Sequence, residues 1–265
     1  MPDKDKVRLG GMALQNGVLV HGPTSWACAV RAASGEVKVA SERKKLLAPG
    51  LTSPFLRGPV KLIESVAFLP RLKRLLPEAK LPFEGPRIVV TMVGTSIVLN
   101  GVRRSKLGDA SKELLAGLLA LGPGVLALRG GELASYHGAE HIAIGSYEHG
   151  EPRAREHERC GTHLAGPMLA TSAVGNILAA RAPARYRTSA RAAAAVGSIA
   201  AATELFGWMQ RHPNTRLARA LARPGYEFQH RIATAEPSPE QLEVAEAALA
   251  ACLELELTPA PAQPA

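Results

Sequence analysis

Alternating apolar and polar positions characterise the N-terminal part of the chain. The runs GVLVH and WACAVRA are followed by the pair Ser34-Gly35 and then by EVKVASE. Such runs on either side of a Ser-Gly pair are typical of paired strands, because successive side chains of a strand point to opposite faces of the sheet. The pattern predicts that about the first 40 residues are β-structure with a hairpin turn at Ser34-Gly35.

A second β-hairpin is predicted over residues 87–102. This segment, RIVVTMVGTSIVLNGV, is rich in β-branched residues on both sides of Gly94. β-Branched residues favour strands, and a central glycine suits a tight turn. Upstream, residues 57–76 carry apolar residues at helical spacing, and Pro70 is expected to kink or split that helix. Its predicted inward-facing residues are Val60, Ile63, Ala67 and Leu75.

From Asp109 onward the apolar spacing becomes helical. Ser238, Pro239 and Gln241 are typical of a helix start with a capping box. The chain is therefore predicted to be an α+β protein, in which N-terminal β-hairpins precede a mainly helical C-terminal half. The predicted helices cover residues 109–121, 133–147, 162–181, 187–211, 214–222 and 239–255.

We expect one domain over residues 1–256, β-rich over 1–105 and helical over 106–256. A long Gly/Ser or charged linker, which would favour two domains, does not occur in the sequence. The final stretch LTPAPAQPA, residues 257–265, is rich in Pro and Ala and is predicted to be disordered.

The net charge of +9 favours an anionic neighbour such as lipid or nucleic acid. Arginine is abundant, yet no lysine follows Lys112, which indicates a compositional Arg/Ala bias. Aromatic residues make up only 4% of the chain, so the stacking side chains of a single-strand binder are scarce. Nucleic-acid binding is therefore disfavoured.

Three apolar windows, 114–128, 164–180 and 192–203, bear on membrane insertion. A spanning helix needs about 20 apolar residues. The first window is short and contains Pro-Gly, the second contains Thr, Ser and Asn, and the third is mostly alanine. These windows are more typical of buried helices, or of helices lying against a bilayer, than of spanning helices. Membrane association is expected, with integral membrane insertion as the alternative.

The cysteine pattern favours a reducing environment. Cys28, Cys160 and Cys252 are widely spaced and odd in number, and the N-terminal MPDKDKVRLGG has no apolar run resembling a signal peptide. Both features are typical of a cytoplasmic protein whose cysteines are thiols or metal ligands. Cys28 and Cys252 are expected in the core.

The chemistry-bearing residues concentrate between His137 and His163, where five of the eight histidines occur. On a helix, His137 and His141 lie one turn apart on one face, with Glu140 directed toward the same face. The string HGAEH fits the H-x-x-E-H pattern, in which two imidazoles bind zinc and the glutamate activates a water. Gly138 weakens the pattern, because glycine costs roughly 1 kcal/mol inside a helix.

A second group of candidate ligands follows in HERCGTH. His157 and Cys160 are separated by two residues, a short spacing that metal sites use, and Gly161 allows the backbone to turn beside them. The alternative is that these are polar histidines on a solvated helix and an arginine-rich loop. We predict a divalent metal site, with zinc favoured, formed by His137, His141, His157 and Cys160. Three protein ligands would leave a position for catalysis, whereas four would close the site.

Several longer blocks are also informative: GGMALQNGVLVHGPTSWACAVRAASGEV, LRGPVKLIESV, YHGAEH, HERCGT and PGYEFQHRIATAEPSPEQLEVAEAALAA. In this order they resemble the YqhQ-like family, a bacterial family of unknown function often described as predicted metal-dependent enzymes. The resemblance covers most of the chain and implies a multi-pass membrane protein. It also implies that the matching His137, Glu140, His141, His157 and Cys160 are metal or catalytic positions.

The chain departs from the family pattern at four positions. A Glu usually stands where this chain has Asn16, an Arg where it has His21, and a Lys where it has Ile142. His163 falls where a small or apolar residue is common. If Asn16 replaces an active carboxylate, the departure bears on activity.

Two functions follow. The first is a metal-dependent enzyme, a zinc-type hydrolase of unknown substrate with Glu140 as general base. The alternative is a non-enzymatic, membrane-associated scaffold with a structural metal site.

Overall fold

The N-terminal part of the protein is a four-stranded antiparallel sheet. The computed structural model describes residues 6–44, 53, 60, 63–64, 66–129 and 131–258. Strands β1 (Gly10–Leu14), β2 (Gly17–His21), β3 (Ser25–Arg31) and β4 (Val37–Arg43) form a meander in the order β1-β2-β3-β4. The predicted turn at Ser34-Gly35 joins β3 to β4, and Gly35 has a φ of 88°, a conformation that favours glycine.

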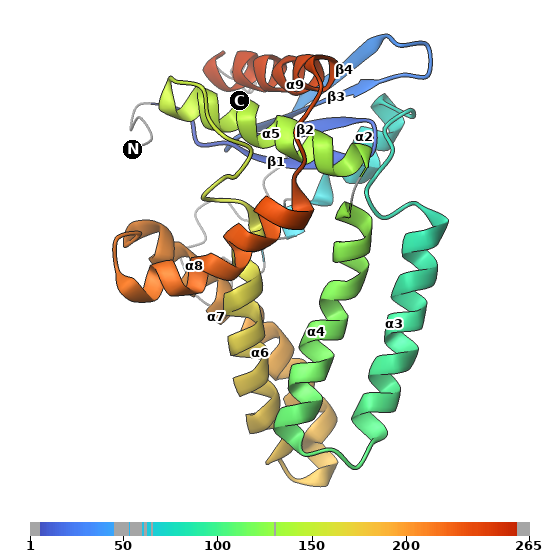
Figure 1. Ribbon diagram of the computed structural model, residues 1–265, viewed down its shortest axis with the longest axis vertical. Coiled ribbons are helices and arrows are strands. Elements are labelled where there is room, and N and C mark those ends of the chain that lie inside the picture. Colours follow the sequence, from blue (N-terminus) through green and yellow to red (C-terminus); the bar gives the residue numbers. More distant parts are fainter. Residues whose placement is uncertain are drawn as a thin grey trace, which may run out of the picture.

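Both faces of the sheet are covered. Side chains that alternate along β2 and β3 enter two separate cores, as the period of a strand requires. On one face, α5 (Glu132–His149) and α9 (Pro239–Leu257) pack against the sheet and each other (Figure 1). On the other face, Trp26 and its neighbours contact α2 (Leu69–Leu75) and the residues around it. Cys28 and Cys252 are fully buried in these cores, as predicted.

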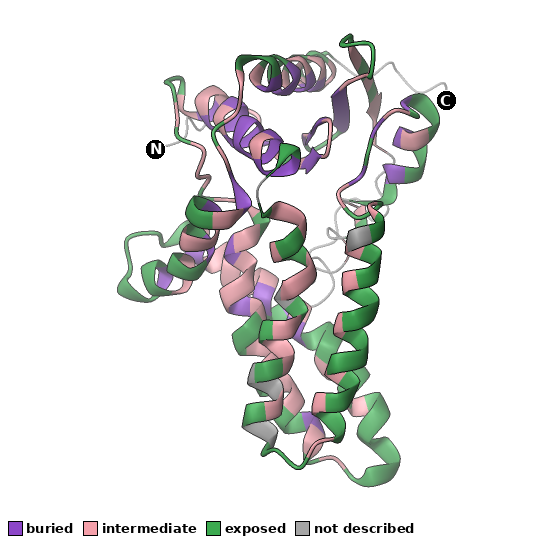
Figure 2. Cartoon of the chain, turned by 45° about the vertical axis from the view of Figure 1, so that its right-hand side comes forward, coloured by how far each residue is buried: buried purple, intermediate pink, exposed green. Residues whose placement is uncertain are grey.

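Long helices extend away from this sheet unit (Figure 1). They pack in the sequence α3 against α4, α4 against α6 and α6 against α7, and α8 contacts α6 and α7. Most of their residues are exposed or half-buried, whereas the buried residues concentrate around the sheet (Figure 2). Their bounds are α3 (Pro86–Arg104), α4 (Asp109–Leu128), α6 (Ala165–Ala180), α7 (Arg187–Arg211) and α8 (Arg216–Phe228).

The α+β prediction is confirmed, and each of the six predicted C-terminal helical segments corresponds to a helix. The capping box is present: Ser238 accepts a hydrogen bond from the Gln241 backbone, and the Gln241 side chain accepts one from the Ser238 backbone. The predicted disordered tail lies almost entirely outside the described residues, although Leu257 is the last residue of α9.

The predicted second hairpin is wrong, because residues 87–102 lie within the helix α3. Pro86 occupies the first turn of α3, a position where its missing N–H costs nothing. A helix satisfies its backbone hydrogen bonds internally, whereas an isolated two-stranded hairpin leaves the backbone groups on its outer edges unpaired. Among the described residues, the last strand consequently ends at Arg43, well before residue 105.

The helix predicted over residues 57–76 divides near Pro70, as expected. Phe68 is in a turn, and α2 begins at Leu69 with Pro70 in its first turn. The predicted buried face is wrong where the structure describes it, since Ile63, Ala67 and Leu75 are exposed. The side chains that cover the sheet follow a different stripe, because the break at Pro70 changes the helical phase. They are Phe68, Leu69, Leu72 and Leu76.

One helical stretch among the described residues, Ala184–Arg211, is long and apolar enough to cross a membrane by length and composition. Only 22% of its most apolar window is buried. This is weak evidence, since the core helix of a soluble protein passes the same test. Membrane association and membrane insertion stay predictions.

The C-terminal end of α9 is tied to the turn between β2 and β3 by Glu256. Its carboxylate accepts hydrogen bonds from the backbone N–H groups of Thr24 (2.8 Å) and Ser25 (2.6 Å) and from both hydroxyls. Burial alone would raise the pKa of Glu256, but the hydrogen bonds from Ser25 and Thr24 outweigh burial, and the pKa is lowered. The ionised carboxylate therefore stabilises the packing of α9 on the sheet.

We predict that Glu256→Gln lowers the free energy of unfolding by about 1–2 kcal/mol at pH 7, since charged hydrogen bonds are replaced by weaker ones. The pKa of Glu256 is lowered on folding, so its contribution is present above the unfolded pKa of about 4.3 and is lost as the pH falls through the folded value. Denaturant unfolding should therefore show the difference from wild type shrinking toward acid pH. Glu254→Gln, at an exposed position of α9, is the control and should change little. A loss of unfolding free energy in Glu256→Gln that is as large at acid pH as at pH 7 would contradict this role.

Candidate metal centre

Helix α5 carries three polar side chains into a buried environment. His137, Glu140 and His141 are 9%, 5% and 2% exposed. The helical spacing places the rings of His137 and His141 on one face, with their centroids 4.3 Å apart. These polar groups are withdrawn from water, which is costly unless each finds a partner.

Backbone carbonyl groups orient both imidazoles. His137 Nδ1 lies 2.8 Å from the carbonyl oxygen of Ala233, and His141 Nδ1 lies 2.6 Å from that of Arg155. A carbonyl oxygen only accepts hydrogen bonds, so each Nδ1 must carry the proton and donate it. In the neutral ring, each Nε2 then has a free lone pair, which is the form that binds a metal.

Cys160 completes a compact group of donor atoms. Its Sγ lies 3.4 Å from His137 Nε2. One ligand atom from each of His137, His141 and Cys160 lies within 4.8 Å of the others, and these three form a group that can hold a metal ion among the described residues. The structure thus brings together two blocks that are separated in the sequence by nearly 20 residues.

In the described part of the chain, the buried atoms of α5 without a hydrogen-bond partner are His141 Nε2 and one carboxylate oxygen each of Glu140 and Glu148. Unpaired buried polar atoms are uncommon in folded proteins and call for an explanation such as a bound ion or water. Burial also lowers the pKa of His141, which favours the neutral imidazole. The orphaned Nε2 is what a metal-ligating histidine requires.

The thiol of Cys160 has a perturbed pKa. Burial alone would raise this pKa, but the neighbouring His141 and the hydrogen bonds from Thr162 outweigh burial, and the pKa is lowered. A lowered pKa favours the thiolate, which is the form of cysteine that binds metals.

Glu140 faces β1 as well as the donor group. A Cβ atom at Gly11 would lie 2.5 Å from Glu140 Oε1, so a larger residue here would displace this carboxylate. Burial raises the pKa of Glu140 to about 8, with a partly opposing effect of His137. A carboxyl group with this pKa gains and loses its proton near neutral pH, and its protonated form predominates at pH 7.

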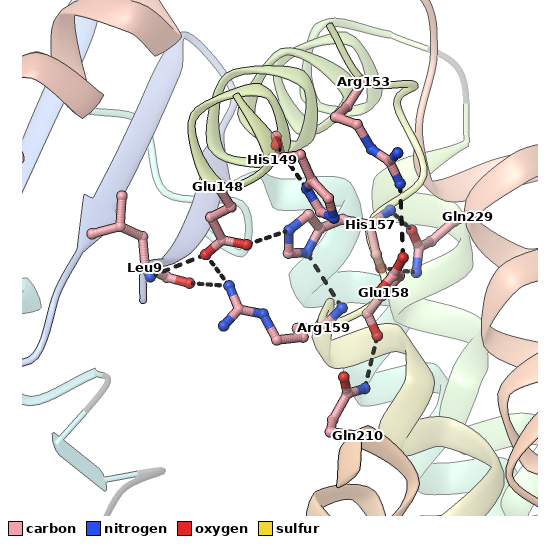
Figure 3. Close-up of polar contacts among 10 residues, drawn as sticks. Leu9, Glu148, His149, Arg153, His157, Glu158, Arg159, Gln210 and Gln229 are labelled. Atoms are coloured by element: carbon pink, nitrogen blue, oxygen red, sulfur yellow. Dashed lines mark hydrogen bonds and ion pairs between the residues drawn. The ribbon is translucent and has the colours of Figure 1, made fainter. Parts of the chain in front are cut away.

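His157, the fourth predicted ligand, lies beside the group but is not part of it. Its ring centroid is 5.5 Å from that of His141. Its Nδ1 accepts a hydrogen bond from the Arg159 backbone (3.3 Å), and its Nε2 faces Glu148 (3.4 Å) (Figure 3). Both ring nitrogens are therefore engaged with protein groups, so in this arrangement neither is free for the donor group.

Buried Glu148 organises this neighbourhood (Figure 3). Besides His157, it forms an ion pair with Arg159 and accepts a hydrogen bond from the Leu9 backbone at 3.3 Å. Burial alone would raise its pKa, but His157 and Arg159 outweigh burial and the pKa is lowered. Glu148 thereby links the start of β1, the end of α5 and the segment that carries Cys160.

Gln229 holds the same segment from the opposite side. It is fully buried at the start of η3 (Gln229–Ala233), a π-helical turn. Its side chain accepts a hydrogen bond from the His157 backbone N–H (2.8 Å) and donates to the His157 carbonyl and the Thr162 hydroxyl. The turn it begins supplies Ala233, which orients His137. Sequence reasoning missed Gln229 and Glu148, although Gln229 lies within a block that carried the family resemblance.

Two of the residues at which the chain departs from the family pattern, Asn16 and His163, have structural contacts. Asn16 joins the β1–β2 turn to residues 78–80: its side chain donates to the carbonyls of Arg31 and Glu78 and accepts from the Lys80 backbone. His163, in η1 (Gly161–Leu164), lies 3.0 Å from the Ala222 carbonyl and is outside the donor group. Neither residue lines the cavity described next.

The donor group opens into a cavity of about 840 Å³ between the sheet unit and the long helices. All five predicted site residues, His137, Glu140, His141, His157 and Cys160, line it. Pockets that bind small molecules typically have volumes of roughly 300–1,000 Å³. The buried polar cluster is therefore accessible to a ligand of that size.

Residues 132–255 match the model of a family described as a protein of unknown function (DUF1385). The matched region runs from α5 into α9 and contains the whole donor group. It relates this part of the chain to an uncharacterised family, while the finer YqhQ-like identification and the metal-dependent activity stay predictions. No curated protein and no solved structure matches the chain.

Close packing against Ala235 explains why HGAEH contains a glycine at position 138. A Cβ atom at this position would collide with the carbonyl oxygen of Ala235, whose own backbone N–H donates to Ala134 of α5 at 2.9 Å. The glycine that weakens helix propensity therefore allows the segment after η3 to lie directly against α5.

We predict that Gly138→Ala destabilises the protein by about 1–3 kcal/mol, the usual cost of forcing an extra methyl group into packed surroundings. The matched substitution Gly94→Ala in α3, where a Cβ atom would meet no atom within 4 Å, should instead stabilise by roughly 0.5–1 kcal/mol through helix propensity. Thermal or denaturant unfolding of the two variants measures the contrast. Stabilisation by both substitutions would show that the close approach at Gly138 is absent.

Proposed function

We propose that the protein is a metal-dependent enzyme, a zinc-type hydrolase whose ion is held by His137, His141 and Cys160. The observation that carries the proposal is the pair of Nδ1 hydrogen bonds to backbone carbonyls, which directs both Nε2 lone pairs toward a thiol. Imidazole and thiolate donors are the set that zinc prefers. Three protein ligands are characteristic of catalytic zinc sites, which keep one position open.

Zinc in such a site would act as a Lewis acid and lower the pKa of a bound water. The protein's own contribution centres on Glu140, which lies one residue from His141 on the cavity side of α5. Its unpaired carboxylate oxygen is available to accept a proton from a molecule in the cavity and to return it to a leaving group. The ion pair of Glu148 with Arg159 holds the Cys160 segment in position.

One observation favours a second function, in which the metal is structural. The ring of His157 is only 5.5 Å from that of His141, and a change of rotamer that releases it from Glu148 would offer a fourth ligand. A site closed by four protein ligands stabilises a fold without catalysis. The protein would then be a scaffold, membrane-associated through its long apolar helices.

We predict that protein purified without chelators contains about one equivalent of zinc, measured by elemental analysis. His141→Ala should lose most of it, because one of three donors is removed. His212→Ala, at an exposed histidine outside the group, should retain it. Sub-stoichiometric zinc, iron and manganese in the wild-type protein would contradict the metal centre.

Glu140→Gln distinguishes the enzyme from the scaffold. The substitution keeps the size of the side chain but removes its ability to accept a proton, so we predict that zinc content is retained while hydrolysis falls by a factor of about 10²–10⁴. The measurement is turnover of a panel of ester, amide and phosphodiester substrates, with Glu158→Gln as the exposed control. Hydrolysis by the wild-type protein that Glu140→Gln does not reduce would eliminate Glu140 as the base.

A further inference from the structure

The walls of the cavity divide by chemical character. The polar lining residues come from α5 and from the segment ending at Gly161, together with His21 of β2. Helices α3 and α4 face them and contribute, among the described lining residues, only apolar side chains, proline and glycine. These are Ile88, Met92, Pro123, Gly124, Ala127 and Leu128.

The cavity is also larger than the proposed chemistry requires. A metal ion with one water needs a small part of about 840 Å³. The remainder is bounded mainly by Met12, Phe83 and the residues of α3 and α4. An apolar space of this size favours an apolar ligand, because contact with such walls offers a polar molecule no replacement for its lost hydration.

The apolar wall continues onto the outer surface of the protein. Phe83 and Met92 line the cavity, yet they are 46% and 50% exposed. On α3, Val89 and Val93 beside Met92 are similarly exposed. Helix α3 packs mainly against α4 among the described elements, and most of its described residues are exposed (Figure 2). Monomeric soluble proteins rarely expose contiguous apolar surfaces of this kind without a function.

We infer that the substrate of this site is an amphiphile from a lipid phase, whose apolar chain lies along α3 and α4 while its polar end reaches His137, His141 and Cys160. This inference rests on the proposed function, since it names the substrate class of the same site. The exposed apolar surface of α3 provides a route from a lipid phase into the cavity. Along this route the apolar chain of the amphiphile does not cross water. A bilayer is the source because that surface is apolar along several helical turns.

The test uses cis-parinaric acid, a fatty acid whose fluorescence increases in apolar surroundings, and the full-length zinc-loaded protein. Wild-type protein should bind the probe. Ala127→Phe, which fills the cavity from α4, should weaken binding at least about tenfold. Ala120→Phe, the same substitution at an exposed position of the same helix outside the cavity, should bind as wild type does. Absence of probe binding by the wild type, or equal weakening by both variants, would overturn the inference.

A second measurement on the wild type alone is independent of whether the variants fold. Octanoate, decanoate and dodecanoate should displace the probe with affinities that rise roughly two- to fourfold per added methylene, the gain expected for burying each group. A flat series would overturn the inference. Zinc analysis of the same samples separates the two proposals. Probe binding without zinc would contradict the proposed metal-dependent enzyme, and zinc without probe binding would contradict only the proposed amphiphilic substrate.

Discussion

Two hydrogen bonds from imidazole Nδ1 atoms to backbone carbonyl oxygens determine which way the buried histidines of α5 face. Because the carbonyl oxygens of Ala233 and Arg155 can only accept hydrogen bonds, the protons of His137 and His141 are held on Nδ1. Both Nε2 lone pairs then face the side where Cys160 lies. Reversing either tautomer would leave a buried carbonyl without its donor, a cost of roughly 1–3 kcal/mol. The candidate metal centre therefore depends on backbone geometry as much as on its donor side chains.

Those carbonyls belong to segments that the fold brings to α5 from different directions. Ala233 ends the π-helical turn that begins at Gln229. The side chain of Gln229 forms hydrogen bonds with the backbone N–H and carbonyl of His157. Glu148 binds Arg159 and the start of β1. Sheet, helix and loop are thus joined by polar contacts (Figure 3). These contacts explain how a group of polar side chains keeps a defined geometry beside a large cavity.

The two halves of the molecule meet at this cavity. The sheet unit, where the buried residues concentrate (Figure 2), provides the polar lining side chains, while α3 and α4 provide apolar ones. Pro123 and Gly124 lie where α4 borders the cavity, inside an otherwise regular helix. A division of this kind suits a site that must accept a molecule with one polar and one apolar end.

Local patterns in the sequence determined the parts of the structure whose stabilising contacts are also local. Capping at Ser238 and helical spacing after Asp109 indicated helices that the structure contains, and the alternation around Ser34-Gly35 indicated β3 and β4. The β-branched run of residues 87–102 was misread, because strand propensity is a weak guide when no neighbouring strand is available.

The sequence likewise placed His137, Glu140 and His141 on one helical face, since that requires only the period of a helix. Which groups join them was decided by tertiary structure. Cys160 meets the pair while His157 turns to Glu148, and Gln229 acts on the site from far along the chain. These outcomes depend on contacts between distant segments and on burial, which makes each unpaired polar atom costly. The spacing of residue types along the sequence predicts neither the contacts nor the burial.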